Sequence, residues 1–247
     1  MIFLFIRIVL LFIVIVCLIE IGQTYYLAME HKKEQTALKN TLKTPEIIVE
    51  WEETEIMEKF RNLCAENRDL IGWLSIPEMV IDYPVLQSED DEYYLHHSFY
   101  GEEDKYGCLF VKNFADVNTP DTNFIIYGHN MNDGSMFGDM DKYKEEAFYR
   151  DHPLIYFDTL YEERTYEIMA VFLSQVYEND DDVFKYYEFY QADTDDEFRY
   201  FYEAITDMSL YETGVTAEFG DTFLMLSTCD YHVDDGRFVV VAKRVGY

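Results

Sequence analysis

The pattern of apolar and polar positions changes character twice before the middle of the chain. Residues 2–19 are apolar apart from Arg7. Residues 22–45 are polar and rich in lysine, and this stretch ends at a proline. Between residues 46 and 67 the apolar positions recur at an imperfect helical spacing, which predicts an amphipathic helix that packs onto the following domain.

Beyond residue 70 the pattern becomes that of short β-strands separated by turn signals. The expected strands are Ile71–Ile76, Val80–Leu86, Tyr106–Val111, Asn123–Tyr127, Leu154–Phe157, Arg164–Ser174, Thr222–Thr228 and Phe238–Lys243. Two helices are expected between them, at Met136–Tyr143 and at Asp193–Leu210, the second with an acidic first turn and one apolar face. Eight short strands with irregular connections predict a mainly β domain, either a barrel or a sandwich of mixed type.

The apolar segment at the start of the chain is close to the ~20 residues that a membrane-spanning helix needs. Counted from Ile8, the uninterrupted apolar run is only 12 residues long, a length that also suits a signal peptide. No small-x-small cleavage site follows it, and Val16 before Cys17 does not suit a lipoprotein site. An uncleaved anchor is therefore the favoured interpretation.

Charge alone does not orient this anchor. Arg7 is the only base on its N-terminal side, whereas Lys32, Lys33, Lys39 and Lys43 follow it. The positive-inside rule therefore gives no support to a cytoplasmic N-terminus. The predicted organisation is an anchor over residues 1–22, a stalk over 23–45 and one domain over 46–247, whose first residues, 46–70, form a helical extension. A domain of about 200 residues can bury a sizeable core.

The chain carries a formal net charge of −30, which excludes nucleic acid as a natural partner because phosphates would be repelled. The acidic run Glu178–Asp182 lacks the spaced ligands and the glycine of an EF-hand loop and is interpreted as solvated. The four cysteines form no CxxC pair, so neither a zinc site nor a redox dithiol is expected. A Cys64–Cys108 disulfide is the only bridge considered, and it is disfavoured. No metal or cofactor is expected.

Cys229 is the strongest candidate for a catalytic residue in this sequence. It ends a predicted strand, and Arg237 begins the next one after a short polar loop. In a hairpin the two side chains converge, and a fixed cation stabilises a thiolate nucleophile. The non-catalytic alternatives are that Cys229 is an inert buried cysteine and that Arg237 pairs with Asp234 or Asp235 on the surface.

A cysteine nucleophile also needs a proton carrier. His129, within the run Tyr127-Gly-His-Asn130, lies at a predicted strand end, where functional side chains are often presented. His232 is the second candidate because it follows Cys229 by three residues. Tyr127, Ser227 and Thr228 flank the proposed site and are candidates for substrate contacts.

These residues fall within blocks that resemble the sortases, specifically class B. The matching blocks are Tyr83-Pro-Val-Leu-Gln, Tyr93-Tyr-Leu-His-His-Ser-Phe-Tyr-Gly101, Asn123-Phe-Ile-Ile-Tyr-Gly-His-Asn-Met-Asn-Asp-Gly-Ser-Met-Phe137, Leu226-Ser-Thr-Cys229 and Arg237-Phe-Val-Val-Val-Ala-Lys243. The family pattern Thr-Leu-x-Thr-Cys is broken at its first position by Met225. That position does not react, so the departure bears on fine positioning. The acidic segment 178–210 is similar to the helical insertion of class B enzymes.

The resemblance implies an eight-stranded sortase β-barrel with an N-terminal helix and a long helix between late strands. It implies a membrane-anchored cysteine transpeptidase with its catalytic domain outside a Gram-positive cell. Such an enzyme cleaves the C-terminal sorting signal of a surface protein after its Thr and joins the protein to an amine of the peptidoglycan precursor. Cys229 would form the thioester, His129 would act as general acid and base, and Arg237 would stabilise the oxyanion or the substrate.

Several points stay open at this stage. Signals of the Asn-Pro-x-Thr type and Leu/Ser/Pro-Pro-x-Thr-Gly variants both fit the family. The acceptor is either a cross-bridge glycine or a diaminopimelate side chain, and pilin polymerisation remains an alternative to anchoring. Other classes are a membrane-tethered cysteine protease or hydrolase and a non-enzymatic binding domain. A papain-like enzyme would place its cysteine on a helix ahead of its histidine, which is the reverse of the order here.

Overall fold

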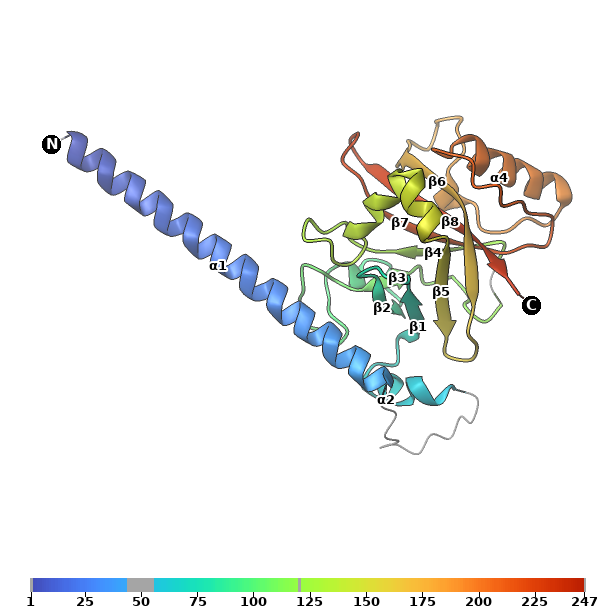
Figure 1. Ribbon diagram of the computed structural model, residues 1–247, viewed down its shortest axis with the longest axis horizontal. Coiled ribbons are helices and arrows are strands. Elements are labelled where there is room, and N and C mark those ends of the chain that lie inside the picture. Colours follow the sequence, from blue (N-terminus) through green and yellow to red (C-terminus); the bar gives the residue numbers. More distant parts are fainter. Residues whose placement is uncertain (1, 44–55, 120, 247) are drawn as a thin grey trace.

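The domain is a closed barrel of eight strands (Figure 1). The computed structural model describes residues 2–43, 56–119 and 121–246. The strands are β1 (Leu70–Ser75), β2 (Asp82–Gln87), β3 (Leu109–Val111), β4 (Asn123–Tyr127), β5 (Leu154–Thr159), β6 (Thr165–Gln175), β7 (Phe223–Cys229) and β8 (Gly236–Val245). All eight predicted strands are present, and of the two predicted architectures the barrel is the correct one.

The order around the barrel is β1-β2-β3-β4-β7-β8-β6-β5. The pairs β2–β3 and β4–β7 are parallel, and the other six neighbouring pairs around the barrel are antiparallel. The β4–β7 pair joins segments about a hundred residues apart, since Tyr127 lies opposite Ser227. This parallel pair brings the ends of two distant strands to the same edge of the barrel.

The central strands are buried on both faces. Leu224 and Leu226 of β7 point into the barrel, whereas Phe223 and Met225 pack on its outside. The outer layer comprises α4 (Asp195–Asp207) and the short 3₁₀ turn η4 (Tyr186–Glu188), both inserted between β6 and β7. Burial on both faces explains why β7 and β8 are continuous apolar runs in the sequence.

The predicted late helix is confirmed as α4. Its N-cap is Thr194, whose side chain accepts from the backbone of Glu197 in a full capping box. The helix predicted at Met136–Tyr143 is instead a 3₁₀ segment, η3 (Gly138–Lys144), followed by α3 (Glu146–Asp151). It starts later than predicted because Met136 has a φ of 51°, which lies outside the right-handed helical region.

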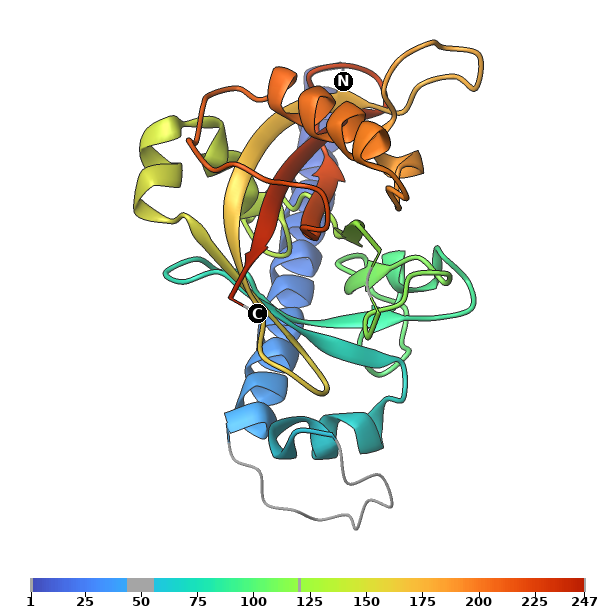
Figure 2. The same ribbon diagram turned by 90° about the vertical axis from the view of Figure 1, so that its right-hand side faces the viewer.

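The N-terminal segment is a single helix, α1 (Ile2–Lys43), so the described residues of the predicted anchor, 2–22, and of the predicted stalk, 23–43, lie on one continuous element. Figure 2 shows its C-terminal half running along the barrel, and its N-terminal half projects beyond it (Figure 1). Residues 46–55 of the amphipathic helix predicted over residues 46–67 lie outside the described residues. The described part of that segment contains a short 3₁₀ turn, η1 (Glu58–Phe60), and a short helix, α2 (Arg61–Glu66). A further 3₁₀ turn, η2 (Tyr93–Leu95), follows β2.

The C-terminal half of α1 docks on the barrel through one face. His31, Gln35 and Leu38 are buried, and their spacing places them on one side of the helix. The His31 ring stacks on Tyr106 with centroids 4.3 Å apart, and its Nδ1 lies 3.2 Å from Asp104 Oδ2. The predicted stalk therefore does not hold the domain at a distance: part of it belongs to the folded body.

Replacing Leu38 with alanine tests this docking. Leu38 is fully buried in the cluster that contains Trp73, so L38A should lower the free energy of unfolding by about 2–4 kcal/mol. Urea unfolding of the full chain in detergent, followed by tryptophan fluorescence, measures the loss. The control L18A removes the same atoms from a residue of α1 that is 62% exposed and should leave the midpoint unchanged. Equal midpoints for both variants would contradict the docked helix.

Candidate active site

Cys229 and Arg237 face each other across the β7–β8 hairpin. Cys229 is the last residue of β7, and its register partner on β8 is Arg237. Residues directly opposite in an antiparallel pair have Cβ atoms about 4.5–5.5 Å apart and share one face of the sheet. Both side chains are half-buried. The structure thus brings together the two residues that the sequence analysis paired.

The Arg237 guanidinium turns back over the hairpin. Its Nη1 donates to the carbonyl oxygens of Asp235, at 3.1 Å, and Gly236, at 2.9 Å. Among the residues that the structure describes, no ion pair joins Arg237 to a carboxylate. The surface salt bridge considered from the sequence is therefore not formed, and the charge of Arg237 remains beside Cys229.

His129 is held beside Cys229 by bonds on both of its flanks. Thr228 Oγ1 donates to the carbonyl oxygen of Gly128 at 2.7 Å. Asn130 Nδ2 donates to the carbonyl oxygen of Cys229 at 2.9 Å. These bonds continue the β4–β7 pairing beyond the formal end of β4, so the backbone of His129 lies alongside the end of β7.

The imidazole of His129 is oriented by a distant segment. Its Nε2 lies 2.7 Å from the carbonyl oxygen of Leu95, the last residue of η2. A carbonyl oxygen only accepts, so Nε2 is the donor, and the neutral ring keeps its free lone pair on Nδ1. His129 can therefore exchange a proton through Nδ1 while its ring stays in place.

His232, the second candidate base, has a different environment. Its Nδ1 lies 2.7 Å from Asp230 Oδ1, and Asp230 also accepts from Lys144 Nζ. Burial by itself would raise the pKa of Asp230, but the hydrogen bonds from Lys144 and His232 outweigh it and lower that pKa. His232 thus belongs to an ion cluster that fixes the loop next to Cys229.

The three candidate substrate contacts are mostly engaged within the protein. The hydroxyls of Ser227 and Tyr186 lie 2.7 Å apart, and the Thr228 hydroxyl donates to the carbonyl oxygen of Gly128. Both Ser227 and Thr228 are buried. Tyr127 is half-buried, with its ring stacked on Phe110, and burial raises its pKa. This geometry favours a supporting role for the two hydroxyls, and contact with substrate stays a prediction.

Tyr186 is a residue of the site that its sequence context did not reveal. It reaches the site from the insertion between β6 and β7, and burial raises its pKa to about 12. Its hydroxyl lies 2.7 Å from Ser227 Oγ, so it contacts β7 two residues before Cys229. No motif could reveal it, because only the tertiary fold brings residue 186 to this edge. Leu95 escaped notice for the same reason.

The described residues contain no group of three or more His, Cys, Asp or Glu side chains suited to hold a metal ion. The four cysteines are free thiols. Cys64 and Cys108 are both buried, and burial raises the pKa of Cys108 well above its usual value. Neither is a competing nucleophile.

Comparison with known proteins agrees with this geometry. The Sortase domain family model matches residues 74–245. Sortase B of Listeria monocytogenes is 36% identical over 231 residues, covering 92% of this chain and 89% of the relative. Sortase B of Staphylococcus aureus is 26% identical over 240 residues, covering 96% and 94%.

Solved structures of sortase B are also similar to this chain. Sortase B from Bacillus anthracis in complex with AAEK2 superimposes with a TM-score of 0.76 at 32% identity, covering 89% of this chain and 97% of that one. A Staphylococcus aureus sortase B–substrate complex gives 0.74 at 25% identity, covering 88% and 98%. The fold and the cysteine site define a cysteine transpeptidase. The chain belongs to the sortase family, and within it to class B.

Replacing Lys144 with glutamine tests the ion cluster. The pKa of Asp230 in the folded state lies below its ordinary value of 3.8, so its stabilisation is present above pH 3.8 and is lost as the pH falls through the folded value. K144Q should lower the free energy of unfolding by about 1–2 kcal/mol at pH 7, since the pair is partly exposed. Urea unfolding at pH 7 and pH 3 measures both values.

The matched control is K142Q, because Lys142 pairs with Asp139 on the surface. Its effect should stay within about 0.5 kcal/mol. A loss for K144Q that is the same at pH 3 and pH 7 would rule out charge pairing as its cause.

Proposed function

We propose that this sortase cleaves a C-terminal sorting signal after its Thr, through a thioester on Cys229, and transfers the surface protein to an amine of the peptidoglycan precursor. The observation that carries the proposal is the hairpin pair Cys229–Arg237 with His129 held alongside. These three residues supply a nucleophile, an oxyanion donor and a proton carrier, which are the groups that acyl transfer requires.

In the first half-reaction the Cys229 sulfur attacks the carbonyl carbon of the Thr residue. The tetrahedral oxyanion accepts hydrogen bonds from Arg237, whose guanidinium is permanently charged. When the C–N bond breaks, protonated His129 gives its proton to the leaving amine. The products are the thioester and the released C-terminal segment.

In the second half-reaction an incoming amine attacks the thioester carbonyl. His129 takes a proton from the attacking nitrogen, and the sulfur leaves as a thiolate. A new amide bond joins the Thr to the acceptor, and the enzyme returns to its starting state. Water at the same position would give hydrolysis, and a pilin amine would give polymerisation, so the acceptor alone separates these outcomes.

Helix α1 gives the enzyme a means of attachment. It is long and apolar enough to cross a bilayer, and the part that carries its apolar stretch makes no buried contact with the barrel. The enzyme is then a single-pass membrane protein with an extracytoplasmic catalytic domain, close to surface proteins and wall precursor.

Intact-mass measurement on sorting-signal peptides tests the thioester. The full chain in detergent, incubated with Asn-Pro-x-Thr and Leu-Pro-x-Thr-Gly peptides, should gain the mass of the peptide portion through Thr. The adduct should be absent in C229A, and H129A should form it at least ~10²-fold more slowly because the leaving amine lacks its acid.

Release by an oligoglycine or a diaminopimelate-bearing peptide then separates transfer from hydrolysis and identifies the acceptor. C64A is the matched control, since it removes a thiol that is buried elsewhere. An adduct that persists in C229A would refute Cys229 as the nucleophile.

Replacing Arg237 with glutamine tests the oxyanion role. Removal of one oxyanion donor typically lowers kcat by about 10²–10³. R237Q should show this loss, and R237K should recover only part of it because lysine lacks the planar fork. Steady-state kinetics with a soluble peptide give kcat and KM. The exposed Arg199 of α4 provides the control R199Q, which should retain full activity. A change in KM alone would limit Arg237 to substrate binding.

A further inference from the structure

The loop between Cys229 and Arg237 exposes apolar side chains on a fixed support. Tyr231 is 80% exposed, the largest exposure of any large apolar or aromatic side chain that the structure describes beyond α1, and Val233 is 42% exposed. The loop is held at both ends, because Asp230 N donates to the Gly236 carbonyl at 2.9 Å and Val176 N donates to Asp235 at 3.0 Å. Apolar groups presented on a rigid tip are typical of an interaction surface.

The position of α1 sets the level of a bilayer relative to this loop. Residues 2–21 of a helix span about 30 Å, the thickness of the hydrocarbon core. The exposed Tyr25 and Tyr26 follow at the position of an interfacial aromatic belt. Among the residues of α1 whose burial is described, the first buried one is His31, which lies about 15 Å beyond Ile21 along the helix. The headgroup layer covers roughly half of that distance, so the barrel begins close to the membrane surface.

A short series of contacts connects His31 of α1 to the active site. His31 stacks on Tyr106, and the Tyr106 hydroxyl donates to Asp133 Oδ2 at 3.0 Å. Asp133 belongs to the same loop as Asn130, which donates to the carbonyl of Cys229. The loops that carry the catalytic residues therefore lie on the side of the barrel that α1 first reaches as it runs from its N-terminus.

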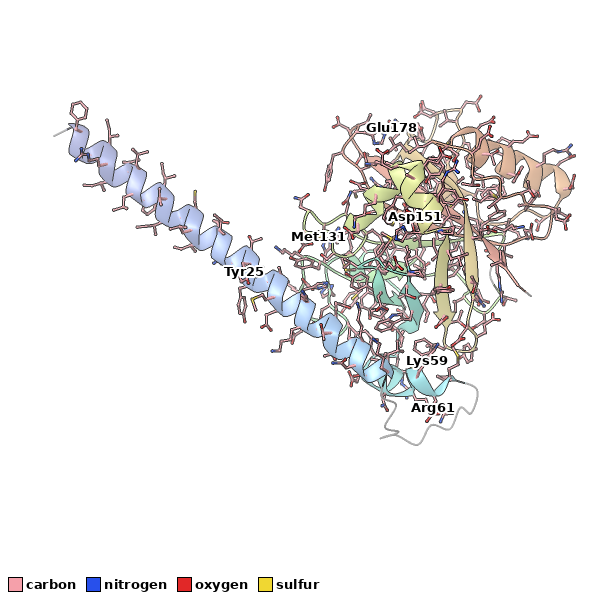
Figure 3. The ribbon with its side chains drawn as sticks, viewed as in Figure 1. Tyr25, Lys59, Arg61, Met131, Asp151 and Glu178 are labelled. Atoms are coloured by element: carbon pink, nitrogen blue, oxygen red, sulfur yellow. The ribbon has the colours of Figure 1, made fainter. Side chains whose placement is uncertain are left out.

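The figures agree with this chain of contacts. Met131, in the loop between Asn130 and Asp133, lies at the edge of the barrel nearest Tyr25 of α1 in Figure 3. In Figures 1 and 2 the β7–β8 loop points to the same side as the N-terminus, and the C-terminus lies at the other end of β8. Helix α4 lies across the barrel from α1 in Figure 1.

We propose that the β7–β8 loop contacts the membrane surface, with Tyr231 and Val233 in the lipid interface. This inference rests on the membrane anchor proposed above and adds a second attachment point, which holds Cys229 at the level of the bilayer. Tyrosine suits this layer because its ring is apolar and its hydroxyl stays in water. The neighbouring Asp234 and Asp235 are exposed carboxylates, so the contact should favour zwitterionic over anionic headgroups.

Quenching by brominated lipid tests the contact on the full chain. Y231W is reconstituted into nanodiscs of phosphatidylcholine, with and without bromine on the acyl chains. The emission of the added tryptophan, after subtraction of the unsubstituted chain, should shift to the blue and lose at least half of its intensity. Phosphatidylglycerol discs should give weaker quenching.

Two reporters control the measurement. F12W lies in the apolar half of α1 and should be strongly quenched, which verifies the anchor. Y200W lies on α4, where Tyr200 is 58% exposed, and should not be quenched. If the tryptophan of F12W is quenched and that of Y231W is not, the loop contact is overturned and the anchor is left intact. Failure of F12W would overturn both, and equal quenching of Y231W and Y200W would show unspecific adsorption.

Rates of adduct formation with two substrates show whether the loop contacts lipid or the sorting-signal peptide. The double variant Y231S/V233S should lose about tenfold in adduct formation with a sorting signal attached to a membrane helix. It should react normally with the free soluble peptide, because the catalytic residues are unchanged. Equal losses on both substrates would show that Tyr231 contacts the peptide instead, and would overturn the proposal.

Discussion

The parallel pairing of β4 with β7 is the constraint on which the active site depends. It fixes Tyr127 opposite Ser227, and hydrogen bonds from Thr228 and Asn130 extend it to the level of Cys229. Because side chains alternate along a strand, a slip by one residue would turn the cysteine to the other face of the sheet. The same register error in β8 would remove Arg237 from its position opposite the thiol. Catalytic geometry here is thus a property of strand register.

This register is enforced by two cores at once. The inner faces of β7 and β8 fill the barrel, and their outer faces are covered by the insertion that contains α4 and η4. A strand that is apolar on both faces has no alternation to specify its register, so the volumes of the two cores must do so. The insertion also delivers Tyr186 to Ser227. Stability of the outer layer and order in the site are therefore coupled.

The extent to which sequence predicted this structure follows from the range of each interaction. Local sequence patterns predicted the strands and α4. Motifs pointed to Cys229, His129 and Arg237, and the family resemblance supplied the roles of these three residues. Contacts between distant segments left no such signal: the bond from His129 to Leu95 is one example, and the packing of α1 along the barrel is another. A lysine-rich composition suggested a stalk, but the buried face of α1 consists of only a few residues, His31, Gln35 and Leu38, each about one turn from the next. The start of η3 was misplaced because a positive φ at Met136 is a tertiary outcome.

The docked face of α1 is more polar than a helix–barrel contact needs to be. His31 Nε2, Glu34 Oε1 and Gln35 Oε1 are buried without a hydrogen-bond partner among the described residues, and burial raises the pKa of Glu34. Such groups cost free energy that apolar residues would not. What they add is directionality, since the stacked and hydrogen-bonded His31 fits Tyr106 and Asp104 in one rotation of the helix. An apolar seam would tolerate rotation or sliding of α1, and the catalytic loops would then change their height above a bilayer. A polar contact near the point where the helix would leave the membrane is suited to fix that height.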